Sequence, residues 1–213
     1  MTALLPDKTV ASIRWLAAPT SWSWLEQANS NLINLLIDHA HCERKAAGSA
    51  VQMMFRYLCE PGLAEVLSPI AQEELEHFDQ VLALVKKRGR YLEPLQSPEY
   101  GAKLAKSIRK GEPNRMLDSF LVAGLIEARS HERMALLAEH CEDQELRCLY
   151  SSLLTSEARH FGQYWLLCEE RWDRALVTAR LEELAIIEVE ALTGSLQNPS
   201  DVRMHSVGVE PIS

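Results

Sequence analysis

The sequences Glu74-Leu75-Glu76-His77 and Glu157-Ala158-Arg159-His160 repeat the pattern Glu-x-x-His at an offset of 83 residues. A single glutamate precedes each copy at nearly the same interval: Glu43 lies 31 residues before Glu74, and Glu127 lies 30 residues before Glu157. A lone glutamate on one helix and Glu-x-x-His on its neighbour, present twice, is the ligand set of carboxylate-bridged dimetal sites in four-helix bundles. The repeat therefore predicts an all-α protein whose four main helices enclose two metal ions.

The chemistry of these side chains explains why the pattern indicates a metal site. Two residues three positions apart lie on the same face of a helix, so both can reach one ion. Buried carboxylates are costly and repel one another unless cations neutralise them. Carboxylates and imidazoles suit iron or manganese, and the absence of thiolates from the pattern disfavours zinc or copper. We predict that the following six side chains bind the two ions: Glu43, Glu74, His77, Glu127, Glu157 and His160.

Hydrophobic periodicity and helix-end signals predict the bundle itself. A capping-box pattern at Ser23–Glu26 opens the first long helix, and Pro61-Gly62 closes it. The expected long helices cover about residues 24–58, 63–88, 113–141, 142–171 and 173–193, with a short helix between Ser97 and Gly111. Short turns within pairs and one long crossover between pairs are typical of a ferritin-like four-helix bundle. We expect one such domain over residues 1–195, with a crossover helix and an additional C-terminal helix, and an irregular tail over residues 196–213.

Composition narrows the class of protein. The chain has 213 residues, of which 47% are hydrophobic and nine are Gly, as in an ordered globular protein. Five cysteines without a C-x-x-C pair favour reduced thiols in a cytoplasmic protein over a disulfide framework. No uncharged apolar run approaches the ~18 residues of a membrane span, and the N-terminus does not resemble a signal peptide. We therefore expect a cytoplasmic protein that does not enter a membrane.

Several neighbours of the six predicted ligands allow two interpretations. His39 and His131 lie four residues from Glu43 and Glu127, so they either orient these glutamates or form ordinary buried hydrogen bonds. Small residues flank the same glutamates and either leave a pocket for dioxygen and an apolar group or allow close helix packing; they are Ala46, Ala47, Gly48, Ala50, Ala123 and Gly124. Some nearby arginines are expected to pair with Glu73, Glu76 or Glu132, and most to form surface ion pairs; they are Arg44, Arg129, Arg133 and Arg159.

The segment from Lys86 to Arg115 carries an unusual positive charge. It has nine basic and three acidic residues, a net +6, so the rest of this −8 chain carries −14. Such an asymmetry indicates an anion-binding face, although lysines near helix ends are also favourable on a purely solvated surface. The candidate nucleic-acid contacts are Lys86, Lys87, Arg88, Arg90, Lys103, Lys106, Arg109 and Lys110.

Four local sequences resemble those of a known enzyme family. They are LIDHAHCERKAA at 36–47, QEELEHF at 72–78, LIEARSHER at 125–133 and TSEARHF at 155–161. They resemble the bacterial tRNA 2-methylthio-isopentenyladenosine hydroxylase family, MiaE, and the similarity extends over about residues 20–195. All six predicted metal positions match the pattern of that family.

The resemblance implies an O₂-dependent, non-haem di-iron monooxygenase that hydroxylates the isopentenyl group of a modified adenosine next to the tRNA anticodon. It implies that Glu43, Glu74 and His77 hold one iron, that the other three predicted ligands hold the second, and that Glu74 and Glu157 bridge them. No Gly-rich nucleotide fingerprint is present, so a separate reductase or ferredoxin is expected as the electron donor. The substrate partner would be tRNA, and the basic segment is the natural candidate for its binding.

Other dimetal proteins share this ligand pattern. A hydroxylase of ubiquinone biosynthesis would need an apolar membrane-contacting surface, and no such segment stands out. A manganese catalase is possible on the ligands alone. An iron-storage ferritin would usually lack the second Glu-x-x-His, and a purely structural metal site is disfavoured because stable bundles do not require one.

Overall fold

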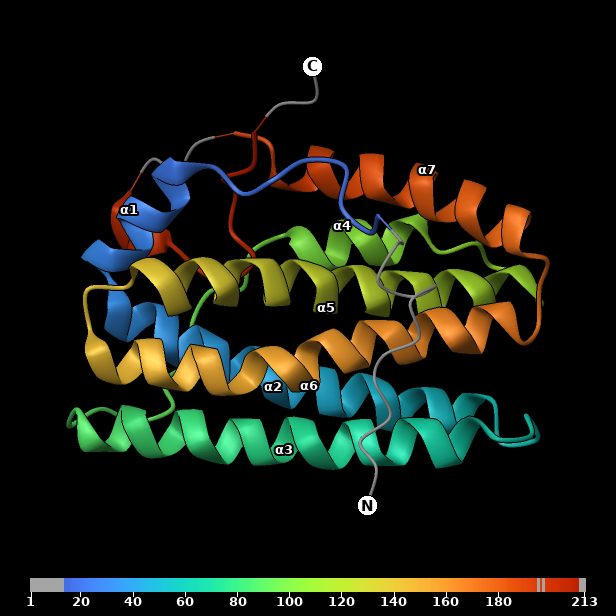
Figure 1. Ribbon diagram of the computed structural model, residues 1–213, viewed down its shortest axis with the longest axis horizontal. Helices are drawn as coiled ribbons and strands as arrows, with labels where there is room; N and C mark the ends of the chain where they lie inside the picture. Colours follow the sequence, from blue (N-terminus) through green and yellow to red (C-terminus); the bar gives the residue numbers. More distant parts are fainter. Residues whose placement is uncertain (1–13, 195, 197, 211–213) are drawn as a thin grey trace.

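The computed structural model describes residues 14–194, 196 and 198–210, and within them every regular element is a helix (Figure 1). Strand pairing in this part of the chain is limited to one isolated bridge between Thr20 and Val209. The helices are α1 (Trp22–Ser30), α2 (Leu32–Arg56), α3 (Leu63–Lys87), α4 (Tyr100–Ser107), α5 (Asn114–His140), α6 (Gln144–Glu169), α7 (Arg174–Leu192) and a 3₁₀ helix, η1 (Pro199–Asp201).

Four long helices form the body of the molecule. α2 packs along α3, α5 packs along α6, and the α3 and α6 surfaces join the two pairs. Each pair is connected by a short turn, whereas the chain between α3 and α5 crosses the bundle and contains α4 (Figure 1). α7 lies outside α5 and contacts both α4 and α5. The predicted ferritin-like bundle with a crossover helix and an additional C-terminal helix is therefore confirmed.

The helix ends show where local sequence signals decide the structure. α3 ends in a Schellman motif: Gly89 adopts a φ of 71°, its N–H donates to the Lys86 carbonyl, and the Arg90 N–H donates to the Val85 carbonyl. The side chain of Asp143 caps α6 by accepting from the N–H groups of Glu145 and Leu146. These boundaries lie within about two residues of those expected from the sequence.

The first predicted helix is wrong in two respects. It is interrupted at Asn31, whose backbone (φ −140°, ψ 43°) leaves the helical region and separates α1 from α2. The capping box expected at Ser23 does not form, because the N-cap of α1 is Ser21 and the Ser23 hydroxyl lies 2.9 Å from the Ser21 hydroxyl instead. Because of this break, α1 does not continue the axis of α2. Trp24 and Leu25 of α1 are buried in one cluster with Val202 and Met204 of the C-terminal segment, residues 198–210.

Two hydrophobic clusters occupy the two halves of the bundle. One contains Phe120, Leu121 and Trp165 and extends to the inner face of α7. The other contains Leu36 and Tyr150 and includes buried side chains of α1 and of the chain end. Burying one large apolar side chain stabilises the fold by ~1.5–3 kcal/mol. These clusters hold the helices rigidly on both sides of the polar residues between them.

The C-terminal segment packs against the bundle through buried arginines. The Arg133 guanidinium is fully buried and donates to the carbonyl of Ser206 at 2.9 Å and to that of Met204. Arg129 is also fully buried and pairs with Glu188 of α7 at 2.8 Å. Arg129 also pairs with Glu132, as the first of the two interpretations of these arginines predicted. The expectation of a surface ion pair is wrong for Arg133, because the C-terminal segment covers it.

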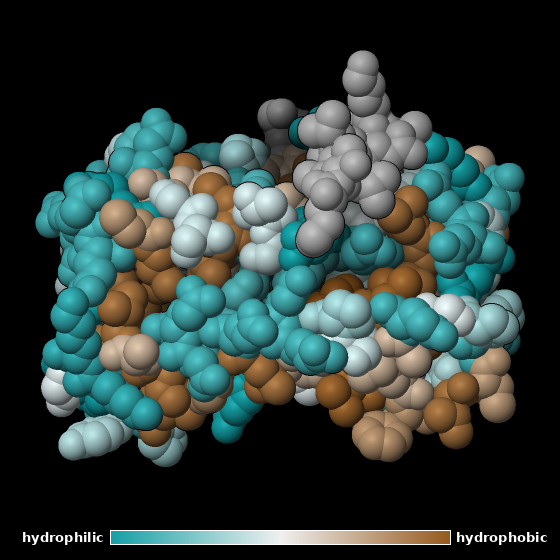
Figure 2. All heavy atoms as spheres, turned by 60° about the horizontal axis from the view of Figure 1, so that its bottom comes forward, coloured by the Kyte–Doolittle hydropathy of each residue, from teal (hydrophilic) through white to brown (hydrophobic). Residues whose placement is uncertain are grey.

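The surface is mixed in character. On the face shown in Figure 2, hydrophilic side chains cover much of the surface and hydrophobic ones lie in separate groups among them. Among the described residues, every helix is too short or too polar to cross a bilayer.

Candidate metal centre

The six predicted ligands converge in the middle of the bundle. Glu43 projects from α2, Glu127 from α5, and each Glu-x-x-His from the helix paired with them, α3 or α6. All six are buried, with at most 6% of any residue exposed. Convergence follows from the helix pairing, because each ligand lies mid-helix at a similar distance from the turn that joins its pair.

Their ligand atoms form two overlapping groups. Glu43, Glu74, His77 and Glu157 offer atoms that all lie within 4.8 Å of one another, and so do Glu74, Glu127, Glu157 and His160. Glu74 and Glu157 belong to both groups, which is the placement needed to bridge two ions. The contacts include His77 Nδ1 to Glu157 Oε1 at 3.3 Å and His160 Nδ1 to Glu74 Oε1 at 2.6 Å.

Several of these atoms lack a hydrogen-bond partner among the described residues. They are both carboxylate oxygens of Glu74, Oε1 of Glu157, and Nδ1 of His77 and of His160. Their close approaches do not have hydrogen-bond geometry, although buried polar atoms are nearly always satisfied. Cations between them would satisfy all of these atoms together, so the residues present fit a pair of metal ions. The buried cluster and the fold are compatible with a di-iron site.

A second layer of side chains orients the predicted ligands. His77 directs Nε2 to the Ser156 hydroxyl at 3.0 Å, and His160 directs Nε2 to the Glu73 carboxylate at 2.7 Å. Arg159 also pairs with Glu73. Glu73 is one of the partners expected from the sequence for the nearby arginines, and this expectation is confirmed for Arg159. Both imidazoles therefore present Nδ1 to the cluster, as ligands with fixed ring orientation do.

The structure distinguishes between the two histidines that flank the single glutamates. His39 is fully buried, contacts the Glu43 carboxylate and stacks on Tyr150, so it orients this carboxylate. His131 is partly buried and packs edge-on against Phe161 at 5.7 Å, and among the described residues its ring makes no hydrogen bond, so neither interpretation is confirmed for it.

Burial and mutual contact shift the pKa values within the cluster. Burial raises the pKa of Glu127 well above its usual value, and the neighbouring carboxylates raise it further. Burial acts to lower the pKa of His77, but contacts with Glu157 and Glu43 raise it to about 12. Burial acts to raise the pKa of Glu43, but His39 and His77 lower it to about 2. In the metal-free cluster, His77 therefore holds a proton at neutral pH, and Glu127 holds its proton to a higher pH than a free glutamate does.

A cavity of about 370 Å³ reaches the cluster at Glu127. Ala46 and Ala123 form part of its wall, as the pocket interpretation of the small residues predicted. Gly124 serves close packing instead, because a Cβ built there would lie 2.3 Å from the Trp15 ring. The volume is within the range of ligand pockets.

Two aromatic residues of the cavity wall were not anticipated from the sequence. Tyr100 of α4 and His205 of the C-terminal segment stack at 4.8 Å between ring centroids, and both line the cavity. His205 Nε2 lies 3.1 Å from the Ser130 hydroxyl of α5. No local signal marks either residue, because α4 and the chain end meet only in the folded molecule.

The basic segment does not form a single surface. Lys86 to Arg90 lie at the end of α3, where Lys87 pairs with Glu145 at 2.6 Å and Arg88 pairs with Asp143 at 2.8 Å. The residues from Lys103 to Lys110 lie on and directly after α4, within the crossover. Their predicted contact with tRNA stays a prediction.

Comparison with known proteins places the chain in a family. The model of the tRNA-(MS2IO6A)-hydroxylase (MiaE) family matches residues 7–206. A tRNA 2-(methylsulfanyl)-N(6)-isopentenyladenosine(37) hydroxylase from Pseudomonas putida is 38% identical, over 90% of this chain and 92% of the relative. The enzyme of the same name from Salmonella typhimurium is 27% identical, over 91% and 88%.

A solved structure agrees with this fold. It is described as Protein 43 with aldehyde deformylating oxygenase activity from Synechococcus. It is 76% identical and superimposes with a TM-score of 0.92, covering 93% of this chain and 98% of that one. Because the family model spans nearly the whole sequence and a curated relative exceeds one third identity, the chain belongs to the MiaE family of tRNA hydroxylases.

Proposed function

We propose that this protein is a di-iron monooxygenase that hydroxylates the isopentenyl group of 2-methylthio-isopentenyladenosine next to the tRNA anticodon. The observation that carries the proposal is the buried cluster of four glutamates and two histidines at the inner end of a ligand-sized cavity. The family membership supports the substrate, and it favours this activity over ubiquinone-type hydroxylation, catalase activity or iron storage.

In this proposal, Glu43 and His77 would help to hold one iron and Glu127 and His160 the other, and Glu74 and Glu157, which belong to both groups of ligand atoms, would serve both. When bound, the iron pair supplies the reduction of O₂ with two electrons and two protons, so that one oxygen atom enters a C–H bond and the other leaves as water. The histidines keep Nδ1 toward the ions because Ser156 and Glu73 hold their Nε2 atoms.

The cavity would position the substrate and exclude water from the metal cluster. Its inner end lies at Glu127, so a short branched hydrocarbon chain that fills it places its terminal carbons beside the metal cluster. Ala46, Ala123 and Ile126 provide apolar walls for that chain. Electrons would come from a separate reductase or ferredoxin, and we expect an enzyme that modifies tRNA to act in the cytoplasm.

Nucleoside analysis of a gene-deletion strain tests the proposal most directly. Mass spectrometry of its tRNA should show the prenylated adenosine without the added hydroxyl group. The wild-type gene should restore the hydroxylated form, and a Glu157→Ala gene should not, because it removes a side chain shared by both ligand groups. An unchanged level of hydroxylated nucleoside in the deletion strain would contradict the proposal.

Aldehyde deformylation is a second candidate, favoured by the 76% identity to the Synechococcus protein. The same cavity and cluster would accept a fatty aldehyde. Incubating the iron-loaded protein with a long-chain aldehyde, O₂ and an electron donor should release formate if this candidate holds. Formate release together with unaltered tRNA nucleosides in the deletion strain would make it the main activity.

A further inference from the structure

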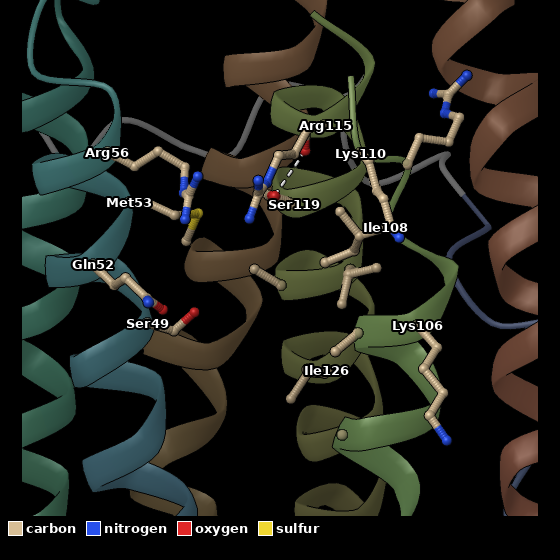
Figure 3. A pocket seen from close by; sticks show the side chains of 15 residues that line it. Ser49, Gln52, Met53, Arg56, Lys106, Ile108, Lys110, Arg115, Ser119 and Ile126 are labelled. Carbon is tan, nitrogen blue, oxygen red and sulfur yellow. Dashed lines mark hydrogen bonds between the residues drawn. The ribbon is translucent and has the colours of Figure 1, made fainter. Parts of the chain in front are cut away.

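A second, larger cavity adjoins the one that reaches the metal cluster. It has a volume of about 870 Å³ and opens between α2, α5 and the crossover that contains α4 (Figure 3). The two cavities share four wall residues: Ser49, Gly101, Ala123 and Ile126. A molecule can therefore occupy both, with one part beside Glu127 and another in the larger cavity.

The larger cavity concentrates positive charge in a protein of net charge −8. Five of its fifteen lining residues are basic and none is acidic; the basic ones are Arg56, Lys106, Arg109, Lys110 and Arg115. Four of these five belong to the basic segment from Lys86 to Arg115, and three of the four are candidate tRNA contacts. Arg115 lies at the start of α5, and Arg56, from outside the segment, lies at the end of α2. The folded chain thus brings together cations that are about 60 residues apart in sequence.

Most of these cations are not neutralised by the protein. Arg109 pairs with Asp118 at 2.7 Å, and Asp118 also pairs with Arg180, so its charge is already used. Among the described residues, the side chains of Arg56, Lys106, Lys110 and Arg115 form no ion pair. Unpaired cations gathered around a concave site attract an anionic ligand.

Two of the unpaired cations, Arg56 and Arg115, are arginines in the wall of the same cavity. In Figure 3, the side chains of Arg56 and Arg115 extend toward each other from opposite sides of the cavity. A guanidinium group offers paired N–H donors that match two oxygens of a phosphate. Between these arginines and the cluster lie the shared small and apolar residues, Ala123 and Ile126 among them.

We propose that this larger cavity binds the phosphodiester groups beside the modified nucleotide, with Arg56 and Arg115 as the main contacts. This inference rests on the proposed function and deepens it. The prenyl group occupies the apolar cavity at Glu127, while the phosphates are held by the basic one. The arrangement suits a substrate with an apolar group attached to a polyanion, whereas a fatty aldehyde has no group that would use the arginines.

Two probes separate phosphate recognition from recognition of the base. The first is a fluorescein-labelled RNA anticodon stem-loop that carries the prenylated adenosine, and the second is the prenylated nucleoside without phosphate. Arg56→Ala and Arg115→Ala should each weaken stem-loop binding about three- to tenfold in low salt, measured by fluorescence anisotropy. Each should also reduce the slope of log affinity against log salt by about 1. Binding of the nucleoside should stay at the wild-type level.

Arg174→Ala is the matched control, since Arg174 is an exposed arginine outside the cavity that pairs with Glu169 at 2.9 Å. It should leave both affinities unchanged, and all variants should keep the wild-type melting temperature. Unchanged stem-loop affinity in Arg56→Ala and Arg115→Ala, or equal weakening by Arg174→Ala, would overturn the inference. Either result would leave the proposed function intact if the deletion strain lacks the hydroxylated nucleoside, whereas a deletion strain with normal tRNA would overturn the function itself.

Discussion

At the scale of single residues, the two histidines of the predicted metal site have chemically different partners. His160 is backed by the anionic Glu73, which Arg159 also binds, whereas His77 is backed by the neutral hydroxyl of Ser156. A carboxylate behind an imidazole increases its basicity more than a hydroxyl does. The two halves of the cluster therefore have the same types of predicted ligand, but the residues that hydrogen-bond to their histidines differ.

Replacing Glu73 tests the importance of this layer. Glu73→Gln keeps the size of the side chain but removes its charge, so we expect metal affinity to fall about 10- to 100-fold. Titration of the metal-free protein with Fe²⁺ under anaerobic conditions would measure the change. Glu76→Gln is the control, because Glu76 is an exposed glutamate on the same helix. Equal affinities for both variants would show that Glu73 does not support His160.

The histidines themselves make a stronger prediction. His77→Ala and His160→Ala each remove one nitrogen ligand and leave the opposing carboxylates without it. We expect each purified variant to contain at most about half the iron of the wild-type protein and to have no hydroxylase activity. His131→Ala is the control, since His131 packs against Phe161 outside the cluster. Full iron content in both ligand variants would refute the assignment.

At the scale of the elements, the position of each helix is set by contacts remote in sequence. α5 approaches the N-terminal segment so closely that only a glycine fits at position 124, against Trp15. The C-terminal segment is held in turn by the buried guanidinium of Arg133. These contacts fix α5, and with it the position of Glu127 at the inner end of the cavity.

Replacing two glycines of the long helices, Gly124 and Gly48, by alanine should change the free energy of unfolding in opposite directions. Gly124→Ala places a methyl group against the rigid Trp15 ring, and such overpacking costs about 1–3 kcal/mol of unfolding free energy. Gly48→Ala adds a methyl group with no atom within 4 Å, so the better helix propensity of alanine should stabilise the protein by up to about 1 kcal/mol. Urea denaturation would measure both changes. A stabilised Gly124→Ala variant would contradict the packing of α5 against Trp15.

At the scale of the whole molecule, two hydrophobic clusters enclose a charged centre that is unfavourable without cations. Burial raises the pKa values of Glu127 and Glu74, and contact with carboxylates raises that of His77. Each group with a raised pKa holds its proton more tightly in the folded metal-free protein than in the unfolded chain. Its contribution to stability is therefore lost as the pH rises through the folded-state pKa. Bound metal ions would replace these protons and neutralise the buried carboxylates, so the fold would not lose this stability as the pH rises.

Metal binding should consequently release protons and stabilise the fold. Calorimetric titration with Mn²⁺ near neutral pH, in two buffers of different ionisation enthalpy, should reveal a net release of protons, because the ions displace the proton that His77 holds with a pKa of about 12. Affinity should rise with pH, and saturating metal should raise the melting temperature. Metal binding without proton release, or affinity that falls as the pH rises, would contradict the raised pKa values.

The sequence predicted the ligand set and the bundle because both depend on local spacing. Glu-x-x-His places two side chains on one helix face wherever that helix packs, and the near-equal intervals bring the four helices into register. Turn signals such as Gly89 located the helix ends because a positive φ strongly favours glycine. The break at Asn31 escaped prediction because no glycine or proline marks it.

Only the tertiary structure decided which side chains surround the centre. Arg129 and Arg133 are buried, His205 lies in the wall of the smaller cavity, and Arg56 and Arg115 both line the larger one. Each of these placements depends on segments far apart in sequence. A pattern of residues states which face a side chain occupies on its own helix, but not which other segment covers that face. Candidate ligands can therefore be predicted from periodicity alone, whereas burial and charge pairing arise from contacts that exist only after the helices, the crossover and the C-terminal segment have packed together.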